Sequence, residues 1–393
     1  MDGINGAIAQ SDMRSRISTG KMSGIKSADR LNVGFVPTMD CATLIAAKEL
    51  GLFEEYELDV RLSREVGWAT IREKLLHEEL DAVAAHASVL LSIHCGIGVV
   101  ARPCLTGLIL SSRGSAITLS NELWDLGARD AATTGQIIRN RQSSRRFVFG
   151  IVLELSTQHY LLSQWLRAGG LDPDKDVHIV VIPSGLIYEN FSKGFLDGYC
   201  VAEPWNSAAV KNHTGWIVTT SADAALVHPE KVLLVLKDFA EQRESVHVRL
   251  LAALIAASRF CENLSNRGQL AAMLAKPCYF DVPEDYLKNA LVGPFDSGRG
   301  IKKQENFISF DAQTIGAPTQ ATGRMVLDLF KALDRRPSKI SLSSDVIEKT
   351  FRKDIYDKAT RLELNQRRSA VSDAHEPSAW RQAPGQVGAA TFA

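Results

Sequence analysis

The sequence lacks most of the short motifs that mark enzymes. It has no G-x-S-x-G nucleophile elbow, no P-loop and no G-x-G-x-x-G segment. Its six cysteines form no C-x-x-C pair, and its nine histidines show no spacing typical of a metal site. These absences disfavour nucleophilic catalysis, nucleotide binding and a zinc or redox centre. We therefore expect a protein that is not an enzyme and that needs no cofactor or metal.

The sequence also lacks a net charge and a long apolar segment. Lys plus Arg and Asp plus Glu both number 45, so no overall field favours nucleic acid or an acidic membrane as the partner. No stretch is long and uncharged enough to span a bilayer. Residues 1–30 are rich in Ser, Gly, Lys and Arg and contain no apolar segment of the length that a secretory signal requires. These features predict a cytoplasmic protein with a disordered segment at 1–30.

From Leu31 onward, the sequence alternates between strand and helix patterns. Such an alternation is typical of a parallel, doubly wound α/β sheet, because each helix returns the chain to the start of the next strand. Asp40 is predicted to cap the first helix. The first unit comprises predicted strands at 31–37, 58–62, 81–86 and 104–110, with helices at 41–50, 68–76 and 88–95 between them.

A second α/β unit follows a polar, Arg-rich segment at 121–146, which is predicted to be a long surface helix and a loop. After this second unit, segment 216–235 is expected to return to the first sheet, before a long helix at 238–264. The strands and helices of the second unit are predicted at 147–152, 155–168, 177–182, 185–193 and 199–202.

One unit inserted into another gives two lobes with a ligand cleft between them. This is the architecture of a hinged ligand-binding protein, in which closure of the lobes couples binding to shape. The chain is expected to cross between the lobes near 112–117 and 199–206. The predicted division places lobe 1 at 31–114, lobe 2 at 115–203, the rest of lobe 1 with the C-terminal helices at 204–363, and a disordered tail at 364–393.

The stretch at 196–210, LDGYCVAEPWNSAAV, is a candidate for the functional centre. It is predicted to be an apolar strand that ends near Glu203 and a helix that begins at Pro204, because proline suits a first helical turn. A strand that ends at a helix N-terminus is where α/β proteins bind small anions. The structural alternative is an ordinary turn in which Trp205 fills the core.

Further polar residues are predicted at strand ends and helix starts, where loops of both lobes face the cleft. A planar oxyanion such as nitrate accepts hydrogen bonds but donates none, whereas bicarbonate carries a proton and favours an extra acceptor. Each of these residues also has a structural interpretation. Trp68 could fill the core, Lys231 could be a solvent-facing lysine at a strand start, and Gln158 could cap its helix. His86 and His94 are interpreted as interior histidines. The candidate set comprises Trp68, Ser115, Gln158, His159, Glu203, Trp205, Asn206 and the HPEK segment that ends at Lys231.

Several segments together carry a family resemblance: GFVP at 34–37, SREVGWATIR at 63–72, GYCVAEPWN at 198–206 and HPEK at 228–231. From about Leu31 to Phe295, the sequence resembles the nitrate and bicarbonate solute-binding family of ABC transporters. The resemblance implies a two-lobed periplasmic-binding-protein fold of the second type. That family commonly has Gln at the position of Ser115 and His at that of Gln158. The ligand-binding residues that it implies are Trp68, Ser115, Gln158, His159 and Lys231, with Glu203 and Trp205 near the cleft.

Members of this family without a signal peptide resemble cytoplasmic nitrate/nitrite sensors of the NasS type. Those sensors hold an antiterminator protein of the NasT type and release it when the anion binds. The resemblance therefore implies nitrate or nitrite and such an antiterminator as partners, with no direct contact to nucleic acid. The alternative is the substrate-binding component of a nitrate/nitrite or bicarbonate ABC transporter. A related enzyme of pyrimidine-precursor synthesis is a third class, but it would need a catalytic His or Cys cluster.

Overall fold

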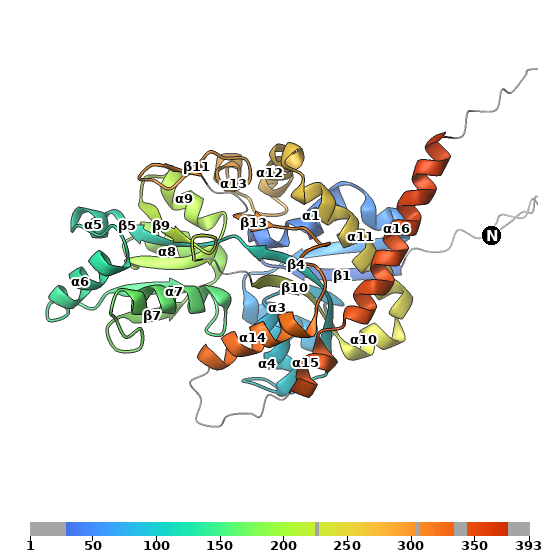
Figure 1. Ribbon diagram of the computed structural model, residues 1–393, viewed down its shortest axis with the longest axis horizontal. Helices are drawn as coiled ribbons and strands as arrows, with labels where there is room; N and C mark the ends of the chain where they lie inside the picture. The colour runs from blue at the N-terminus through green and yellow to red at the C-terminus, as the bar shows by residue number, and fades with distance from the viewer. Residues whose placement is uncertain (1–28, 225–227, 304–306, 334–343, 376–393) are drawn as a thin grey trace, which may run out of the picture.

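The computed structural model describes residues 29–224, 228–303, 307–333 and 344–375. Within these ranges the chain forms two lobes, each built on its own β-sheet (Figure 1). The predicted two-lobed α/β fold is thus confirmed. Of the segment at 1–30, only Asp29 and Arg30 are described, and both already belong to the first strand.

The sheet of lobe 1 contains β1 (Asp29–Phe35), β2 (Leu58–Arg64), β3 (Ala82–Ala85), β4 (Cys104–Arg113), β10 (Pro229–Leu236) and β13 (Ile308–Ser309). Its strand order is β13-β4-β10-β3-β1-β2. The strands β1, β2 and β3 pair in parallel, as the alternating pattern predicts. However, β10 lies between β3 and β4 and runs antiparallel to both. The sheet is therefore mixed, because a strand from after lobe 2 completes it.

Helices cover this first sheet, and two of them differ from the prediction. The expected helix at 238–264 is interrupted at Arg243, whose φ of −121° and ψ of 41° lie outside the helical region. The last helix packs on α11 and β4 and extends to His375, so part of the predicted disordered tail at 364–393 is helical. The helices are η1 (Met39–Cys41), α1 (Ala42–Glu49), α2 (Leu52–Glu55), α3 (Trp68–Leu76), α4 (Ala87–Cys95), α10 (Lys237–Gln242), α11 (Glu244–Glu262), η2 (Leu264–Asn266), α12 (Arg267–Ala275) and α16 (Lys353–His375).

The sheet of lobe 2 contains β5 (Ser115–Ser120), β6 (Val148–Ile151), β7 (His178–Val181), β8 (Gly198–Ala202) and β9 (Gly215–Thr220), in the order β7-β6-β8-β5-β9. The pairs β6–β7 and β6–β8 are parallel, and β5 runs antiparallel to β8 and β9. The prediction that 204–220 belong to lobe 1 is wrong, because β9 pairs with β5. The chain returns to lobe 1 only after Thr220.

The helices of lobe 2 are α5 (Asn121–Asp125), α6 (Ala131–Arg141), α7 (Thr157–Ala168), α8 (Ser184–Ser192) and α9 (Trp205–Lys211). The segment at 121–146, expected to be one long helix and a loop, therefore contains two helices. The second begins at a capping box, in which Asp130 accepts a hydrogen bond from the Thr133 backbone N–H and Thr133 bonds back. This local capping signal explains where the break falls.

Within the described residues, several elements join the lobes. β4 continues through Gly114, whose φ of 86° suits glycine, directly into β5, as predicted for the first crossing. On one side, α12 packs on α1 of lobe 1 and on α13 (Glu284–Leu291), and α13 contacts α9 of lobe 2. The short hairpin of β11 (Phe295–Asp296) and β12 (Ile301–Lys302) follows α13. On another, α14 (Gln320–Leu333), followed by α15 (Ser344–Thr350), contacts both α4 and α7 (Figure 1). None of the described helices has the length and apolar character needed to cross a membrane.

Candidate functional site

Lys231 lies at the centre of a buried cluster of charged and polar side chains. Its Nζ is 2.5 Å from Asp40 Oδ2 and 3.5 Å from Glu230 Oε1. The same Nζ lies 3.4 Å from His86 Nε2 and 4.9 Å from the centroid of the Trp68 ring. Lys231 is 0 % exposed and all its neighbours in this cluster are buried. Of the two interpretations that the sequence allowed, the solvent-facing lysine is therefore excluded.

The Glu230 carboxylate accepts hydrogen bonds from both lobes. Thr157 Oγ1 and His228 Nε2 each lie 2.8 Å from Glu230 Oε2. Gln158 Nε2 lies 2.9 Å from Glu230 Oε1 and 3.3 Å from Ser115 Oγ. Because Thr157, Gln158 and Ser115 belong to lobe 2 and Glu230 to lobe 1, this carboxylate holds the two lobes together.

Local structure explains why adjacent residues reach one site. Neighbouring residues of a regular strand point to opposite faces, yet Glu230 and Lys231 both join the cluster. The pairing of β10 with β4 shifts register on both sides of Lys231, and such irregularities change the direction of side chains. From lobe 2, Ser156 caps α7 by accepting a hydrogen bond from the His159 N–H. That cap places Gln158 in the first turn of α7, next to Glu230.

Burial and neighbouring charges set the ionisation of the cluster. Burial acts to raise the pKa of Glu230, but the charge of Lys231 and the hydrogen bond with His228 outweigh it, so the pKa of this carboxyl lies well below its usual range. Burial, together with the charge of Lys231, holds the pKa of His86 well below its usual value. Burial raises the pKa of Asp40 against the opposing charge of Lys231. Glu230 is therefore ionised and the His86 imidazole is neutral.

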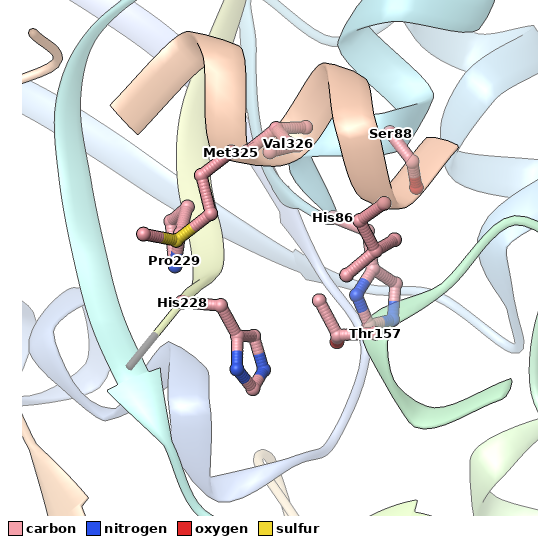
Figure 2. Close-up of a pocket in the computed structure, with 9 residues that line it drawn as sticks. His86, Ser88, Thr157, His228, Pro229, Met325 and Val326 are labelled. Carbon is pink, nitrogen blue, oxygen red and sulfur yellow. The ribbon is translucent and has the colours of Figure 1, made fainter. Parts of the chain in front are cut away.

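A small cavity lies beside the cluster, under α14. Figure 2 shows Met325 and Val326 of α14 on the side of the cavity opposite His228 and Thr157. Its volume of about 10 Å³ leaves room for about one water molecule. Nitrate has four heavy atoms and nitrite has three, so entry of either anion requires the lobes or α14 to move. The lining residues are His86, Ala87, Ser88, Thr157, His228, Pro229, Met325, Val326 and Leu329.

Several buried polar atoms at the cluster lack a partner within the described ranges. They include two hydrogen-bond donors, the Trp68 Nε1–H and the Ser88 hydroxyl, and two further atoms, Gln158 Oε1 and His228 Nδ1. Buried polar atoms are normally satisfied, so four unpartnered atoms on residues of the cluster and of the cavity beside it are consistent with a polar ligand. No three His, Cys, Asp or Glu side chains of the described residues are arranged to hold a metal ion.

A wider cleft of about 790 Å³ opens between the lobes on the other side of Trp68. Arg72 lines it from lobe 1, and Arg146 and His159 line it from lobe 2. Trp68 is in this lining, and its ring also faces Lys231. The indole therefore borders both the wider cleft and the buried cluster.

The structure brings together some of the predicted residues and separates others. Of the predicted set, Trp68, Ser115, Gln158 and Lys231 lie in the buried cluster. His159 instead lines the wider cleft, with Nδ1 2.5 Å from the Glu154 carbonyl oxygen. Glu203 and Trp205 lie between the lobes, where Trp205 Nε1 donates to the Pro37 carbonyl at 3.0 Å.

Three residues that contact the cluster were not among the predicted ligand-binding candidates. Asp40 was predicted to cap the first helix, but it does not cap α1. Its carboxylate instead accepts hydrogen bonds from Thr38 and Lys231. His86 was predicted to be a structural interior residue, but it contacts both Lys231 and Glu230. An acid that directly precedes the apolar helix pattern at 41–50 was the one signal for Asp40. The missed residues are Asp40, His86 and Thr157, whereas His228 and Glu230 belong to the predicted HPEK segment.

Glu203 provides a test of how a buried carboxyl makes stability depend on pH. This carboxyl is fully buried, and burial raises its pKa to about 7, with hydrogen bonds from Ser207 opposing the shift. The folded state holds the Glu203 proton more tightly than the unfolded chain does. The contribution of this proton to the free energy of unfolding is therefore fully present below about 4.3, the pKa of a glutamate in the unfolded chain, and is lost as pH rises through about 7. We expect Glu203→Gln to exceed the wild type in stability at pH 8 by about 3 kcal/mol, and by far less at pH 4.5.

Urea unfolding at pH 4.5 and pH 8 measures this difference. The matched control is Glu189→Gln, which alters an exposed Lys–Glu ion pair on α8 and should change stability by less than about 1 kcal/mol at either pH. Equal stability changes for Glu203→Gln at the two pH values would contradict the prediction.

Comparison with known proteins agrees with this fold. The NMT1-like family matches residues 26–275, which is more than half of the chain. The chain belongs to the NMT1-like family. The chain is 31% identical over 309 residues to the nitrate import ATP-binding protein NrtC of Synechocystis. This alignment covers 76% of the chain and 45% of NrtC. It thus spans less than half of that longer relative.

Two further similar proteins match most of the chain. The nitrate/nitrite binding protein NrtA of Synechococcus elongatus is 27% identical over 374 residues, covering 90% of this chain and 83% of NrtA. The crystal structure of the periplasmic nitrate-binding protein NrtA from Synechocystis superimposes with a TM-score of 0.79 at 22% identity, covering 86% of this chain and 91% of that one. At that identity the superposition establishes the fold, which is of the periplasmic-binding-protein type.

Proposed function

We propose that this chain binds a small planar oxyanion, nitrate or nitrite, in the buried cluster around Lys231. The observation that carries the proposal is the environment of the Glu230 carboxylate, which is itself a planar oxyanion. It is surrounded by Thr157, Gln158, His228 and Lys231, donors drawn from both lobes. The unpartnered Trp68 N–H adds a further donor beside them. Buried donors that converge from two lobes are what a binding protein needs to close on an anion.

The relatives support the same ligand class. Their names include nitrate/nitrite binding, nitrate import and bicarbonate binding proteins. The carboxylates of Asp40 and Glu230 provide the extra acceptors that a proton-carrying anion favours, so bicarbonate belongs among the candidate ligands.

For the biological role, we propose a cytoplasmic sensor that sequesters a transcription antiterminator and releases it on anion binding. A sensor of this kind needs two states that differ in anion affinity; a change from 1:99 to 99:1 takes about 5.5 kcal/mol of differential binding. The Glu230 contacts between lobes could differ between such states, because they join α7 to β10. The second candidate is a substrate-binding component of an ABC transporter, which the transport roles in the relatives' names favour.

Isothermal titration with nitrate, nitrite, bicarbonate and sulfate tests the binding proposal. We expect nitrate or nitrite to bind with micromolar affinity, and Gln158→Ala to weaken this binding by about tenfold or more, because it removes a buried amide that links both lobes. The matched control is Gln142→Ala, which removes an exposed amide bonded to Asp176 in lobe 2 and should leave the affinity unchanged. Absence of binding to all four anions would refute the proposal.

A further inference from the structure

The tautomer of His228 is set by its contact with Glu230. Glu230 is ionised, so its oxygens can only accept hydrogen bonds. Glu230 Oε2 lies 2.8 Å from His228 Nε2, and that nitrogen must therefore carry the hydrogen. In a neutral imidazole the other nitrogen, Nδ1, is then a bare acceptor. His228 is 3% exposed and lines the small cavity, and Nδ1 has no partner among the described residues (Figure 2).

An entering anion faces an unfavourable balance of charge in this cavity. Lys231 is the cation of the cluster, and the carboxylates of Asp40 and Glu230 already lie 2.5 and 3.5 Å from it. Nitrate would add a further negative charge to a buried site and would meet the lone pair of His228 Nδ1. Burying an uncompensated charge is costly, so a positive charge has to accompany the anion.

We propose that His228 Nδ1 takes up one proton from solvent when a monoanion without a proton binds, so that nitrate binding is coupled to proton uptake. The inference rests on the proposed anion site and specifies its chemistry. The proton adds to the Nδ1 lone pair, and no bond between heavy atoms is made or broken. The resulting imidazolium donates from Nε2 to Glu230 and from Nδ1 to the anion, which converts a repulsive contact into a charge-assisted hydrogen bond.

The groups around His228 favour this assignment over other proton acceptors. His86 also lines the cavity, but burial and Lys231 disfavour its charged form. Glu230 is held in its ionised form. Helices α7 and α14 present no titratable side chain among the residues that line this cavity. The charged and titratable groups that face the site are Asp40 from η1, His86 before α4, and Glu230 and Lys231 from β10.

The same nitrogen distinguishes anions that carry a proton. Bicarbonate has an O–H, which can donate to the neutral Nδ1 of His228 without any proton from solvent. Nitrate has none and depends on protonation of the imidazole. At this nitrogen nitrate requires a proton that bicarbonate does not, so we expect fewer protons to be taken up per bicarbonate than per nitrate.

Titration calorimetry of the wild-type protein tests the inference. Nitrate is titrated at pH 8 in phosphate and in Tris, whose ionisation heats differ, and the difference in observed heat gives the number of protons taken up. We expect close to one proton per nitrate at pH 8. Between pH 6 and 9 the dissociation constant should rise by up to about tenfold per pH unit, because the bound state holds the extra proton.

The variant His228→Gln keeps an amide donor for Glu230 but has no titratable nitrogen. It should bind nitrate more weakly at pH 6, with a flat pH profile and no proton uptake. The matched control, His77→Gln, alters an exposed histidine after α3 and should behave as the wild type. Nitrate binding with no proton uptake by the wild type would overturn this inference and leave the proposed function standing. Absence of binding to any anion would overturn both.

Discussion

Replacing Lys231 by Met is expected to destabilise the protein by about 3–5 kcal/mol at neutral pH and to abolish anion binding. The methionine side chain has a similar length, so packing is largely kept while the charge is lost. Asp40 and Glu230 would then be buried near each other without the cation that compensates them, and removing one partner of a buried ion pair carries a cost of this size. Urea unfolding and calorimetry with nitrate measure the two effects.

The matched control for Lys231→Met is Lys193→Met. Lys193 forms a 2.6 Å ion pair with Glu189, but both side chains are 56 % exposed, so its loss should change stability by less than about 1 kcal/mol. The loss of stability caused by Lys231→Met should be smaller at pH 5, because the unpaired carboxylates can then take up protons. A loss as small as that of Lys193→Met at both pH values would show that the buried ion pair contributes little.

The fold was readable from sequence wherever contacts are local. The strands β1, β2 and β3, with α1 and α3 between them, follow a regular alternation, and each predicted range agrees with the structure within a few residues. The alternation could not show that β10 lies between β3 and β4, since more than a hundred residues separate it from either strand. For the same reason, the sequence assigned β9 to the wrong lobe. Strand order depends on pairing over long distances, which periodicity does not report.

The candidate site was readable only in part, for a similar reason. Lys231 and Trp68 were noticed as polar or aromatic residues at element boundaries. Asp40 was missed because a carboxylate before a helix is normally a cap, and its true partner lies 191 residues away. Glu230 was a candidate only as part of the HPEK segment, and neighbouring residues of a regular strand point to opposite faces. Only the register shifts of β10 bring both side chains to one place.

Trp68 combines a structural and a ligand-binding role, and substitutions can separate them. Its ring packs edge-on against His86, with centroids 4.5 Å apart, and lies 4.9 Å from Lys231 Nζ. Trp68→Ala is expected to lose about 3–5 kcal/mol of stability, because a large buried ring leaves a cavity. Trp68→Phe keeps an aromatic face but removes the Nε1–H. That N–H has no partner within the described part of the chain, so its removal should change stability little.

Anion binding should respond differently to Trp68→Phe. If the indole N–H donates to the bound anion, its loss removes a hydrogen bond to a charged group, which contributes about 1.5–3 kcal/mol, or roughly ten- to a hundredfold in affinity. The matched control is Trp216→Phe in lobe 2, where a buried indole N–H also lacks a partner among the described residues but lies in the core around Ile117 and Phe149. Calorimetry should show weakened nitrate binding for Trp68→Phe alone. Unchanged affinity in both variants would mean that the Trp68 indole N–H does not contact the ligand.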